Sequence, residues 1–378
     1  MSAKSEPVDL GAILHGKVYH QYNDLIIRLK RGALLGSYSV AKQTALLLRL
    51  VIGHTRWENV ESLIQILRAV GRGLVSAQPV ELAVGNIVRR VLFIVRQEYE
   101  RLVKEMVAKG VNESIEGVSP GKRIGEQESL YNKSKIEDYT IQVKGLRPSI
   151  IEAIQEELTE LENLYEPIAE QAQRTIHAGE VIFTYGKSRT IEEFLKAANS
   201  KKNLNFEVFV PEAAPSFAGH DMARALSKDG IHTTVINDSA IFAMMARVNK
   251  VIIPCHAVMA NGGLIAHAGT HAVCIAAKLY ECPVVCVTGL YKLSPLYPHD
   301  QDTFNVDLSP HEVLAFEDAD NADKVDVANP RFDYIPPELV NLYVTNFSVV
   351  PSHRSGSHQP SYIYRLLAEY YCPDDYNL

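Results

Sequence analysis

Residues Lys250 to Lys278 read KVIIPCHAVMANGGLIAHAGTHAVCIAAK, and this stretch decides the fold. It opens with a short apolar run, Val251 to Ile253, which predicts a buried strand. A turn-rich segment around Asn261 and Gly262 follows, and from Thr270 onward the apolar residues take helical spacing. Because the loops beyond the carboxyl ends of parallel strands form the ligand crevice of an α/β sheet, we expect this loop to border a pocket.

The same unit recurs around this stretch, since short apolar runs alternate with helical patterns from residue 181 to residue 287. This alternation predicts a parallel, doubly wound sheet of Rossmann-like α/β type, with the post-strand loops on one rim. The expected strands are Val181 to Thr184, Phe206 to Val210, Thr233 to Ile236, Val251 to Ile253, Val284 to Val287 and Asn341 to Val344. The expected helices are Thr190 to Ala198, Phe217 to Lys228, Asp238 to Arg247, Thr270 to Leu279 and Pro360 to Tyr371.

The amino-terminal part, residues 1–110, shows helical periodicity and no strand signal, so we predict a separate helical domain. Its apolar residues fall on one face of each helix, which allows the helices to pack against one another. The expected helices run from Ser39 to Gly53, from Val60 to about Gly71, and from Val80 to Lys109. Glycines stand at the predicted end of each of them.

Residues 111–142 are polar and lack periodicity, which predicts a flexible linker or insertion. A long connecting helix is expected over residues 149–177, because Pro148 is favoured at a helix start. Pro167 predicts a kink or the start of a second helix. With this connection, the α/β domain is predicted to span residues 143–378.

The composition excludes several classes of protein. The chain has 378 residues and a formal net charge of -7, whereas a dedicated nucleic-acid binder normally has a basic excess. The longest apolar runs are far shorter than the roughly 20 residues that span a bilayer, and the start lacks the apolar core of a signal peptide. We therefore expect a cytosolic protein without direct nucleic-acid or membrane binding, with its 5 cysteines reduced.

The segment after the first predicted strand contains Gly186, Lys187 and Arg189 and opens a helix. Backbone N-H groups and the helix dipole favour a phosphate in this geometry, and the two cations would add to the attraction. An ordinary βα turn, with glycine present for its backbone freedom, explains the segment equally well. The spacing is not that of a P-loop.

A zinc site is conceivable at His267, His271 and Cys274, which have Cys255 and His256 nearby in sequence. The reason is that His267 and His271 are spaced by one helical turn. Zinc sites usually show a Cys-x2-Cys pair or a His-Glu-x-x-His signature, and neither is present. We therefore expect no metal and no other cofactor.

Two further features of the predicted rim have structural explanations that are simpler than functional ones. Asn261 and Gly262 allow close approach of a ligand to the backbone, but a plain tight turn accounts for them. Asp238 is the aspartate best placed at a strand end for acid or base catalysis, yet it also starts a predicted helix. A helix-capping role is the simpler interpretation of Asp238.

The third predicted helix carries a set of cations that could receive an acidic or phosphorylated partner. Glu98, Glu100 and Glu105 are interleaved with them, so a solvated helix face is the simpler interpretation. The cations are Arg89, Arg90, Arg96, Arg101 and Lys104.

Taken together, these stretches resemble a known family. Ala240 to Val287 and the run YIPPELVNLYVTN, Tyr334 to Asn346, are similar to the superfamily that unites sugar-phosphate isomerases with the regulatory subunits of eukaryotic translation initiation factor two-B. The helical stretch Trp57 to Leu102 and the Arg147-Pro148 pair fit the same group. The tail SGSHQPSYIYRLLAEYY, Ser355 to Tyr371, is similar to the beta branch of the regulatory subunits. The resemblance covers nearly the whole chain apart from residues 111–142.

The resemblance also implies where a catalytic site would lie and what this chain lacks. The isomerases carry a Cys in a Thr-x-Cys-Asn context, an Asp in a Gly-Ala-Asp turn and a Lys in an Asn-Lys-Ile-Gly-Thr run. The corresponding runs here are Thr184-Tyr185-Gly186-Lys187, Pro254-Cys255-His256 and Ala266-His267-Ala268-Gly269-Thr270. Aldose-ketose isomerisation needs proton transfer by groups of suitable pKa, and these are missing. The resemblance therefore implies a degenerate pocket without catalytic residues, formed by Gly186, Lys187, Arg189, Cys255, His256, Asn261, Gly262, His267, Gly269 and Thr270.

The family further implies a non-catalytic regulatory subunit of the complex that exchanges GDP for GTP on translation initiation factor two. Its expected partners are paralogous regulatory subunits, the catalytic subunits, and factor two itself, including its phosphorylated alpha subunit. The α/β domains would pair, and the helical domains would present a surface that senses the phosphorylation, with Arg89, Arg90 and Arg96 as candidate contacts. Two alternatives stay open: a sugar-phosphate isomerase with a diverged site, and a sensor that binds a nucleotide or sugar phosphate without converting it.

Overall fold

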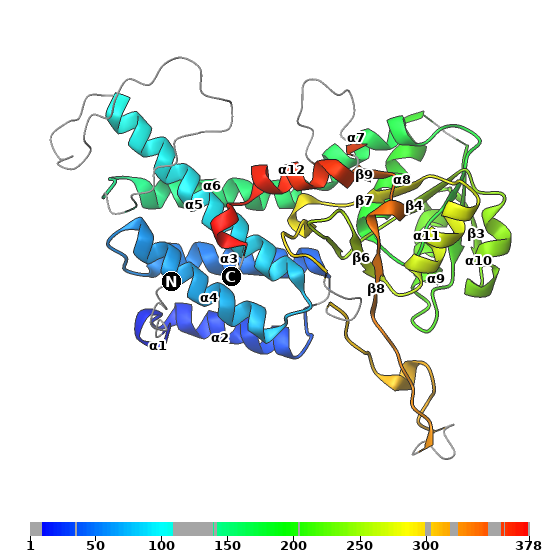
Figure 1. Cartoon of the computed structure of the whole chain (residues 1–378), viewed down its shortest axis with the longest axis horizontal. Helices are drawn as coiled ribbons and strands as arrows, with labels where there is room; N and C mark the ends of the chain where they lie inside the picture. The colour runs from blue at the N-terminus through cyan, green and yellow to red at the C-terminus, as the bar shows by residue number, and fades with distance from the viewer. Residues whose placement is uncertain are drawn as a thin grey trace.

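The computed structural model describes most of the chain. The described residues are 10–34, 36–108, 139, 142–202, 205–298, 304–317, 324–346, 357–358 and 360–376. Figure 1 shows an elongated molecule with a bundle of helices at one end and a sheet covered by helices at the other. The segment predicted to be a linker, residues 111–142, falls almost wholly outside the described residues. Within the described part, no helix combines the length and the apolar character needed to cross a membrane.

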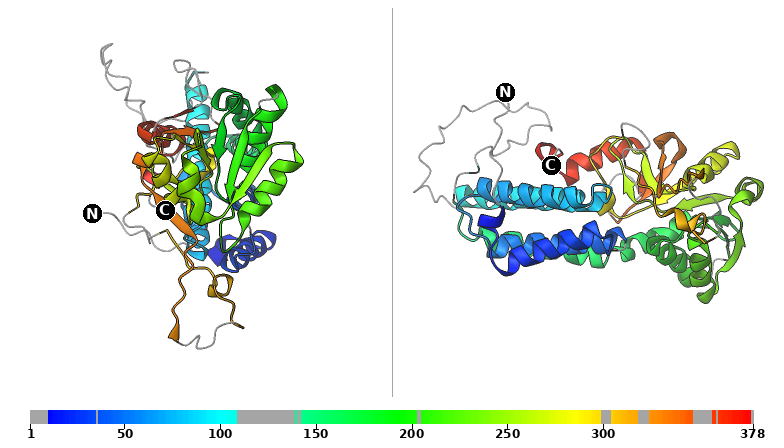
Figure 2. Two further views of the ribbon diagram at one scale, coloured as in Figure 1. Left: turned by 90° about the vertical axis from the view of Figure 1, so that its right-hand side faces the viewer. Right: turned by 90° about the horizontal axis from the view of Figure 1, so that it is seen from below.

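The amino-terminal helices form because each has an apolar face that packs against its neighbours. Helix α4 begins with an Asn59 capping box, in which the Asn59 side chain accepts from the Ser62 backbone N-H at 2.9 Å. Figure 2 shows these helices lying side by side. They are α1 (Leu10–Ile13), α2 (Lys17–Lys30), α3 (Ser37–His54), α4 (Val60–Ala77) and α5 (Leu82–Ala108).

The predicted end of α4 near Gly71 is wrong, because the helix continues through both glycines to Ala77. A Cβ atom on Gly71 would lie 2.6 Å from Val88 of α5, and one on Gly73 would overlap the Tyr22 hydroxyl group of α2. The two glycines therefore permit close packing of three helices instead of ending one. The helix α2 was not predicted at all.

The connecting segment forms two helices, α6 (Leu146–Glu162) and α7 (Tyr165–Thr175). This outcome agrees with the second helix that Pro167 predicted, although α7 begins at Tyr165. The start of α6 is tied to the end of α3, since the Arg147 guanidinium donates to the Gly53 carbonyl at 2.8 Å. The α6 helix thereby belongs to the helical bundle and leads the chain into the sheet.

The main sheet has the predicted doubly wound form. Within the described residues it has seven strands in the order β10-β9-β7-β4-β1-β2-β3, all parallel except β10. Its strands are β1 (Val181–Phe183), β2 (Glu207–Pro211), β3 (His232–Ile236), β4 (Lys250–Ile253), β7 (Val284–Val287), β9 (Leu342–Val344) and β10 (Ser357–His358). Its covering helices are α8 (Arg189–Lys202), α9 (Ala218–Lys228), α10 (Ile241–Met245), α11 (Thr270–Leu279) and α12 (Pro360–Tyr370).

The two faces of this sheet belong to two different cores, because alternate residues of a strand point to opposite sides. One face packs into the same core as the helical bundle through Ile182, Val208, Ile252 and Val285. The other face packs against α10, α11 and α12 through Phe183, Phe209, Ile253 and Cys286. The bundle and one face of the sheet therefore share a continuous apolar interior.

The loop of the stretch Lys250 to Lys278 is more structured than predicted. It contains β5 (Ala257–Val258) and β6 (Leu264–His267), which form a small antiparallel sheet with β8 (Phe332–Ile335). The three strands pack against Leu82 at the start of α5. The expected pocket rim is thus itself a second sheet that meets the helical bundle.

Candidate functional site

Cys255 follows β4 at the carboxyl end of the main sheet and is enclosed. Its Sγ donates to the Thr288 Oγ1 at 3.2 Å, and its carbonyl accepts from the Lys292 ammonium at 2.7 Å. A hydrogen bond with Cys286 and the Lys292 charge lower the pKa of the Cys255 thiol to about 7, although burial acts in the opposite direction. The side chain is only 4% exposed, so a substrate has no route to this thiol.

His256 joins the α/β part to the helical bundle instead of facing a crevice. Its Nε2 lies 3.3 Å from the Val80 carbonyl, and its Nδ1 lies 3.2 Å from the Ser37 Oγ. The ring stacks on Phe332 with centroids 4.4 Å apart. Burial lowers the pKa of His256, despite the nearby Glu81 carboxylate. A neutral ring that donates from Nε2 and accepts at Nδ1 fits both contacts.

The turn at Asn261 and Gly262 is packed against tyrosines of the same chain. Gly262 has φ 83°, which favours glycine, and the Tyr343 hydroxyl donates to its carbonyl. The Asn261 amide donates to the Tyr334 hydroxyl at 2.8 Å. A Cβ atom on Gly263 would lie 2.6 Å from the Tyr334 ring. Glycine is needed here for the approach of a side chain, not of a ligand.

The amino terminus of α11 holds a carboxylate from another element. The Asp333 Oδ2 accepts from the Gly269 N-H at 2.7 Å and from the His271 N-H at 3.0 Å. Gly269 has φ 97°, and the Tyr185 hydroxyl group fills the space beside its Cα. Thr270 donates its hydroxyl to the His267 carbonyl at 2.6 Å. Because a helix amino terminus is where a phosphate would bind, Asp333 occupies the anion position of this site.

Gly186, Lys187 and Arg189 are not joined to the other predicted site residues. The Lys187 ammonium lies 3.9 Å from Asp221 of α9, and its side chain is 48% exposed. The Arg189 guanidinium lies 4.9 Å from the centroid of the Tyr165 ring of α7. The two cations therefore contact different helices and do not converge on a common point.

Asp238 differs from its predicted role as a helix cap. Its two carboxylate oxygens accept from the Ala213 N-H at 3.0 Å and the Ala214 N-H at 2.7 Å. The side chain therefore supports the loop after β2. In the described residues, no group of three His, Cys, Asp or Glu side chains is placed to hold a metal ion.

The three arginines of α5 that we named as candidate partner contacts bind other groups of the same chain, and two of them, Arg89 and Arg96, bind its carboxyl-terminal segment. Arg96 forms an ion pair with Asp375, with side chains 8% and 0% exposed. Arg89 donates to the Asp375 and Tyr376 carbonyls, each at 3.2 Å, and burial lowers its pKa to about 10. Arg90 pairs with Glu157 of α6 at 2.8 Å. In this structure, the three arginines are not a free cationic surface.

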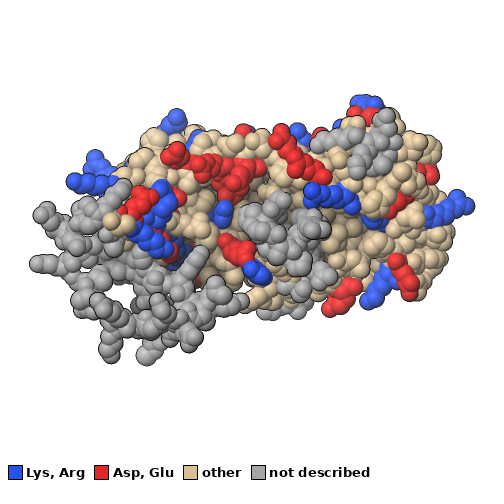
Figure 3. Space-filling model, turned by 90° about the horizontal axis from the view of Figure 1, so that it is seen from above, with Lys and Arg blue, Asp and Glu red and all other residues tan. Residues whose placement is uncertain are grey.

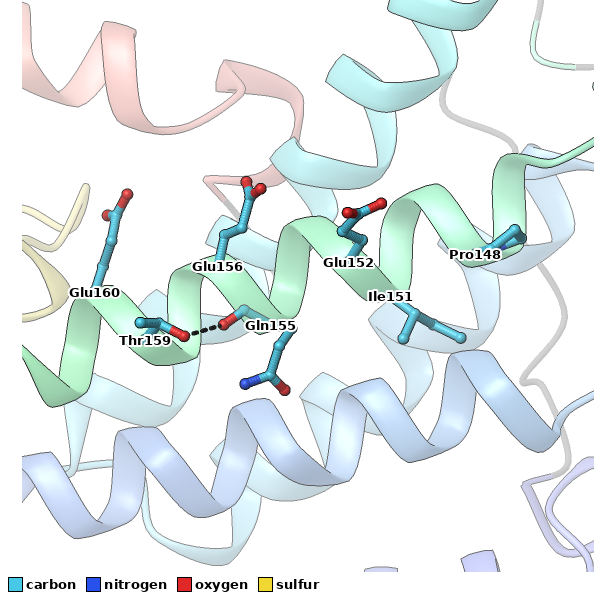
Figure 4. A pocket seen from close by; sticks show the side chains of 7 residues that line it. All are labelled: Pro148, Ile151, Glu152, Gln155, Glu156, Thr159 and Glu160. Carbon is cyan, nitrogen blue, oxygen red and sulfur yellow. Dashed lines mark hydrogen bonds between the residues drawn. The ribbon is translucent and has the colours of Figure 1, made fainter.

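The exposed face of α6 carries negative charge instead. A hollow of about 780 Å³ runs along this helix, and Figure 4 shows the side chains that line it. Figure 3 shows acidic side chains gathered on the upper face of the molecule. Glu152, Glu156 and Glu160 follow one another at four-residue spacing, and burial raises the pKa of Glu160. The hollow is lined by Pro148, Ile151, Glu152, Gln155, Glu156, Thr159 and Glu160.

Two residues that organise these sites, Asp333 and Asp375, were missed by the sequence analysis. Asp333 lies far along the chain from the helix that it caps, and Asp375 lies in the last residues of the chain. Neither belongs to a motif with fixed spacing. The signals in their neighbourhood were the run Tyr334 to Asn346, which directly follows Asp333, and the tail Ser355 to Tyr371, which ends four residues before Asp375.

Comparison with known proteins identifies the group. A family model described as the initiation factor 2 subunit family matches residues 34–352. Translation initiation factor eIF2B subunit beta of Dictyostelium discoideum is 44% identical over 374 residues, 92% of this chain and 94% of the relative. The protein of the same name from Schizosaccharomyces pombe is 37% identical over 391 residues, 94% of this chain and 97% of the relative.

Solved structures agree with this grouping. The crystal structure of eIF2B beta from Chaetomium thermophilum matches with a TM-score of 0.70 and 27% identity, over 95% of this chain and 94% of that one. A chain of the tetrameric eIF2B-beta2-delta2 complex from the same organism matches with a TM-score of 0.68 and 27% identity, over 94% and 96%. These findings confirm the predicted fold class, the predicted family and the prediction of a regulatory subunit that is not an isomerase. The chain belongs to the initiation factor 2 subunit family and, within it, to the beta subunits of the exchange factor eIF2B.

Proposed function

We propose that this regulatory subunit acts by assembling with paralogous subunits and by presenting its helical bundle to translation initiation factor two, in the cytosol. One observation carries the proposal: the crevice in which the related isomerases would bind a substrate is filled by the chain's own side chains. Tyr185 lies against Gly269, Tyr334 against Gly263, and the Asp333 carboxylate occupies the amino terminus of α11. These side chains fill the crevice, so no room for a substrate is left there.

Catalysis is tested directly on the purified full chain with ribose bisphosphate and methylthioribose phosphate as substrates. We expect no isomerisation, because Cys255 is enclosed and the general acid and base are missing. Turnover that disappears in Cys255→Ala would show that the chain is an isomerase with a diverged site. Turnover that persists in the Cys255→Ala variant, purified in the same way, would instead indicate a contaminating enzyme.

Assembly is supported by a close structural relative, which was solved as a tetramer of beta and delta subunits. We expect the full chain to form a stable complex when it is produced together with its delta-type paralogue. Native mass spectrometry of the purified complex gives its composition and stoichiometry. A chain that stays apart from every paralogous subunit under these conditions would contradict the proposed function.

Sensing of phosphorylation is tested by nucleotide exchange on factor two with an unphosphorylated or a phosphorylated alpha subunit. We expect the complex that contains this chain to be inhibited by the phosphorylated form, and the catalytic subunits alone to be insensitive. The described contacts do not favour Arg89, Arg90 and Arg96 as the phosphate contacts, since each is bonded within the chain. Equal inhibition with and without the chain would refute a sensing role.

A second candidate function is a sensor of small phosphorylated ligands, which the loop before α8 favours. Gly186 has φ 69°, and Lys187, whose side chain is 48% exposed, lies two residues before the start of α8. Calorimetry with inorganic phosphate and with sugar phosphates tests this function. Binding that is lost in Lys187→Ala would support a sensor, and the filled crevice leads us to expect no binding.

A further inference from the structure

A two-limbed arm leaves the α/β part between β7 and β8. Its described limbs are residues 304–317 and 324–331, and we call these residues the arm. Figures 1 and 2 show the arm, in orange, projecting away from the rest of the molecule. Its base is fixed in the small core near Leu82, where Phe304 and Phe332 pack. The rest of the arm lies outside the three apolar cores of the described residues.

Hydrogen bonds between the two limbs set the shape of the arm. The Leu308 N-H donates to the Asn329 carbonyl at 2.7 Å, and the Arg331 N-H donates to the Val306 carbonyl at 3.0 Å. Asn329 is 5% exposed, and its side-chain amide donates to the Ser309 carbonyl at 3.0 Å. The best-buried side chain of this part of the arm is therefore a polar one that joins the limbs.

Beyond the base of the arm, most of its large apolar side chains are exposed to solvent. Five of the fifteen large hydrophobic side chains that are exposed in the described part of the chain lie in the arm. They are Val306 at 43%, Leu308 at 37%, Val313 at 52%, Phe316 at 64% and Val325 at 52% exposed. An isolated two-stranded ribbon gains little stability from itself, and grouped exposed apolar side chains mark a protein interface. The arm is thus built to pack on a surface that the chain does not supply.

The charge of the arm region restricts what that surface can be. The two described limbs contain four acidic residues, Asp307, Glu312, Glu317 and Asp326, against Lys324 and Arg331, and the whole chain has a net charge of -7. A second copy of this chain would bring the same acidic arm and the same negative charge, which disfavours self-association. A chain of similar fold with an apolar patch and basic residues at its rim would fit the arm.

We propose that the arm docks onto the α/β part of a paralogous subunit and seats its apolar side chains there, with Phe316 as the main anchor. This inference rests on the proposed assembly with paralogous subunits, and it assigns the surface that forms the contact. A large aromatic side chain that is exposed in the single chain and buried in the complex is typical of an interface hot spot. The carboxylates of the described limbs, Asp307, Glu312, Glu317 and Asp326, would face the basic rim and speed association.

The experiment compares the full chain with single variants in binding to the purified delta-type paralogue. Phe316→Ser removes the anchor, and Tyr364→Ser on α12 is the matched control, because Tyr364 is an aromatic residue that is 66% exposed outside the arm. We expect Phe316→Ser to raise the Kd at least tenfold, about 1.4 kcal/mol, and Tyr364→Ser to change it less than twofold. The melting temperature of the isolated chain should not change in either variant.

A second measurement covers the whole arm without mutation. We expect the backbone N-H groups of residues 304–317 and 324–331 to exchange with deuterium more slowly in the complex than in the isolated chain. A wild-type chain that forms no complex would contradict the proposed assembly itself. A complex that forms normally, with equal affinity for Phe316→Ser and unchanged exchange in the arm, would overturn only the assignment of the arm. An effect of Phe316→Ser on self-association alone would likewise overturn it.

Discussion

The ion pair between Asp375 and Arg96 leads to the sharpest prediction about stability. Asp375 is fully buried and accepts from Arg68 at 2.6 Å and 2.9 Å in addition to pairing with Arg96. Asp375→Asn keeps the shape of the side chain and removes the negative charge from between two guanidinium groups. Arg96, only 8% exposed, would then carry an uncompensated buried charge. Removal of one partner from a buried pair costs about 3–5 kcal/mol.

The expected loss lies near the lower end of that range, because the Arg68 side chain is 33% exposed and can regain hydration. Urea unfolding of the full chain measures the change in the free energy of unfolding. Asp221→Asn is the matched control, since Asp221 pairs with Arg224 at 2.7 Å but is 53% exposed. We expect the control to lose less than about 0.5 kcal/mol. A loss below about 1 kcal/mol in Asp375→Asn would refute the reasoning that this pair holds the carboxyl-terminal segment on α5.

Three further predictions concern single side chains. Gly269→Ala should lower the free energy of unfolding by about 2 kcal/mol or more, because φ is 97° and the new Cβ would overlap Tyr185. Gly230→Ala, with φ 75° and open space around the new Cβ, should lower it less in the same thermal melts. Burial lowers the pKa of His256, so the unfolded chain binds a proton at a higher pH than the folded chain does. The free energy of unfolding should therefore fall as the pH drops below about 6.5. Urea unfolding at several pH values should show a smaller fall for His256→Gln. Glu156→Gln relieves repulsion within the α6 row and should stabilise the chain by about 0.2–0.5 kcal/mol per neighbour, with a smaller gain at high salt in melting experiments. The opposite sign in any of these measurements would contradict the corresponding contact.

The fold could be predicted from the sequence where buried residues follow one another, or recur at regular spacing, along the chain. Strands β4 and β7 are buried on both faces, so their residues form continuous apolar runs that are visible without any partner. Helix α11 runs from Thr270 to Leu279, as its pattern predicts. The small sheet could not be predicted, because β5 has two residues and its neighbour β6 pairs with β8, which lies far along the chain. Such short strands carry no periodicity of their own.

The candidate site was predicted as a set of residues but not as an arrangement. Glycine positions were informative, since Gly262 and Gly269 both need positive φ, yet the sequence could not show what approaches them. The answer depends on Tyr185 and Asp333, whose contacts join segments that are distant in sequence. The arginines of α5 illustrate the same limit, because charge spacing alone cannot distinguish a free cation from one that pairs with Asp375.

The filled crevice and the His256 contacts share one feature, which is that polar groups able to face a ligand are satisfied within the chain. A bound phosphorylated substrate would satisfy the N-H groups at the start of α11 with its own negative charge, and these groups need a partner when no ligand is present. Asp333 supplies that charge permanently, at 2.7 Å and 3.0 Å from the two N-H groups. The segment after β4 likewise faces the chain itself, since His256 contacts Ser37 and Val80 of the bundle. The closed start of α11 and the joining of bundle and sheet therefore both rest on contacts between side chains and backbone groups of this chain.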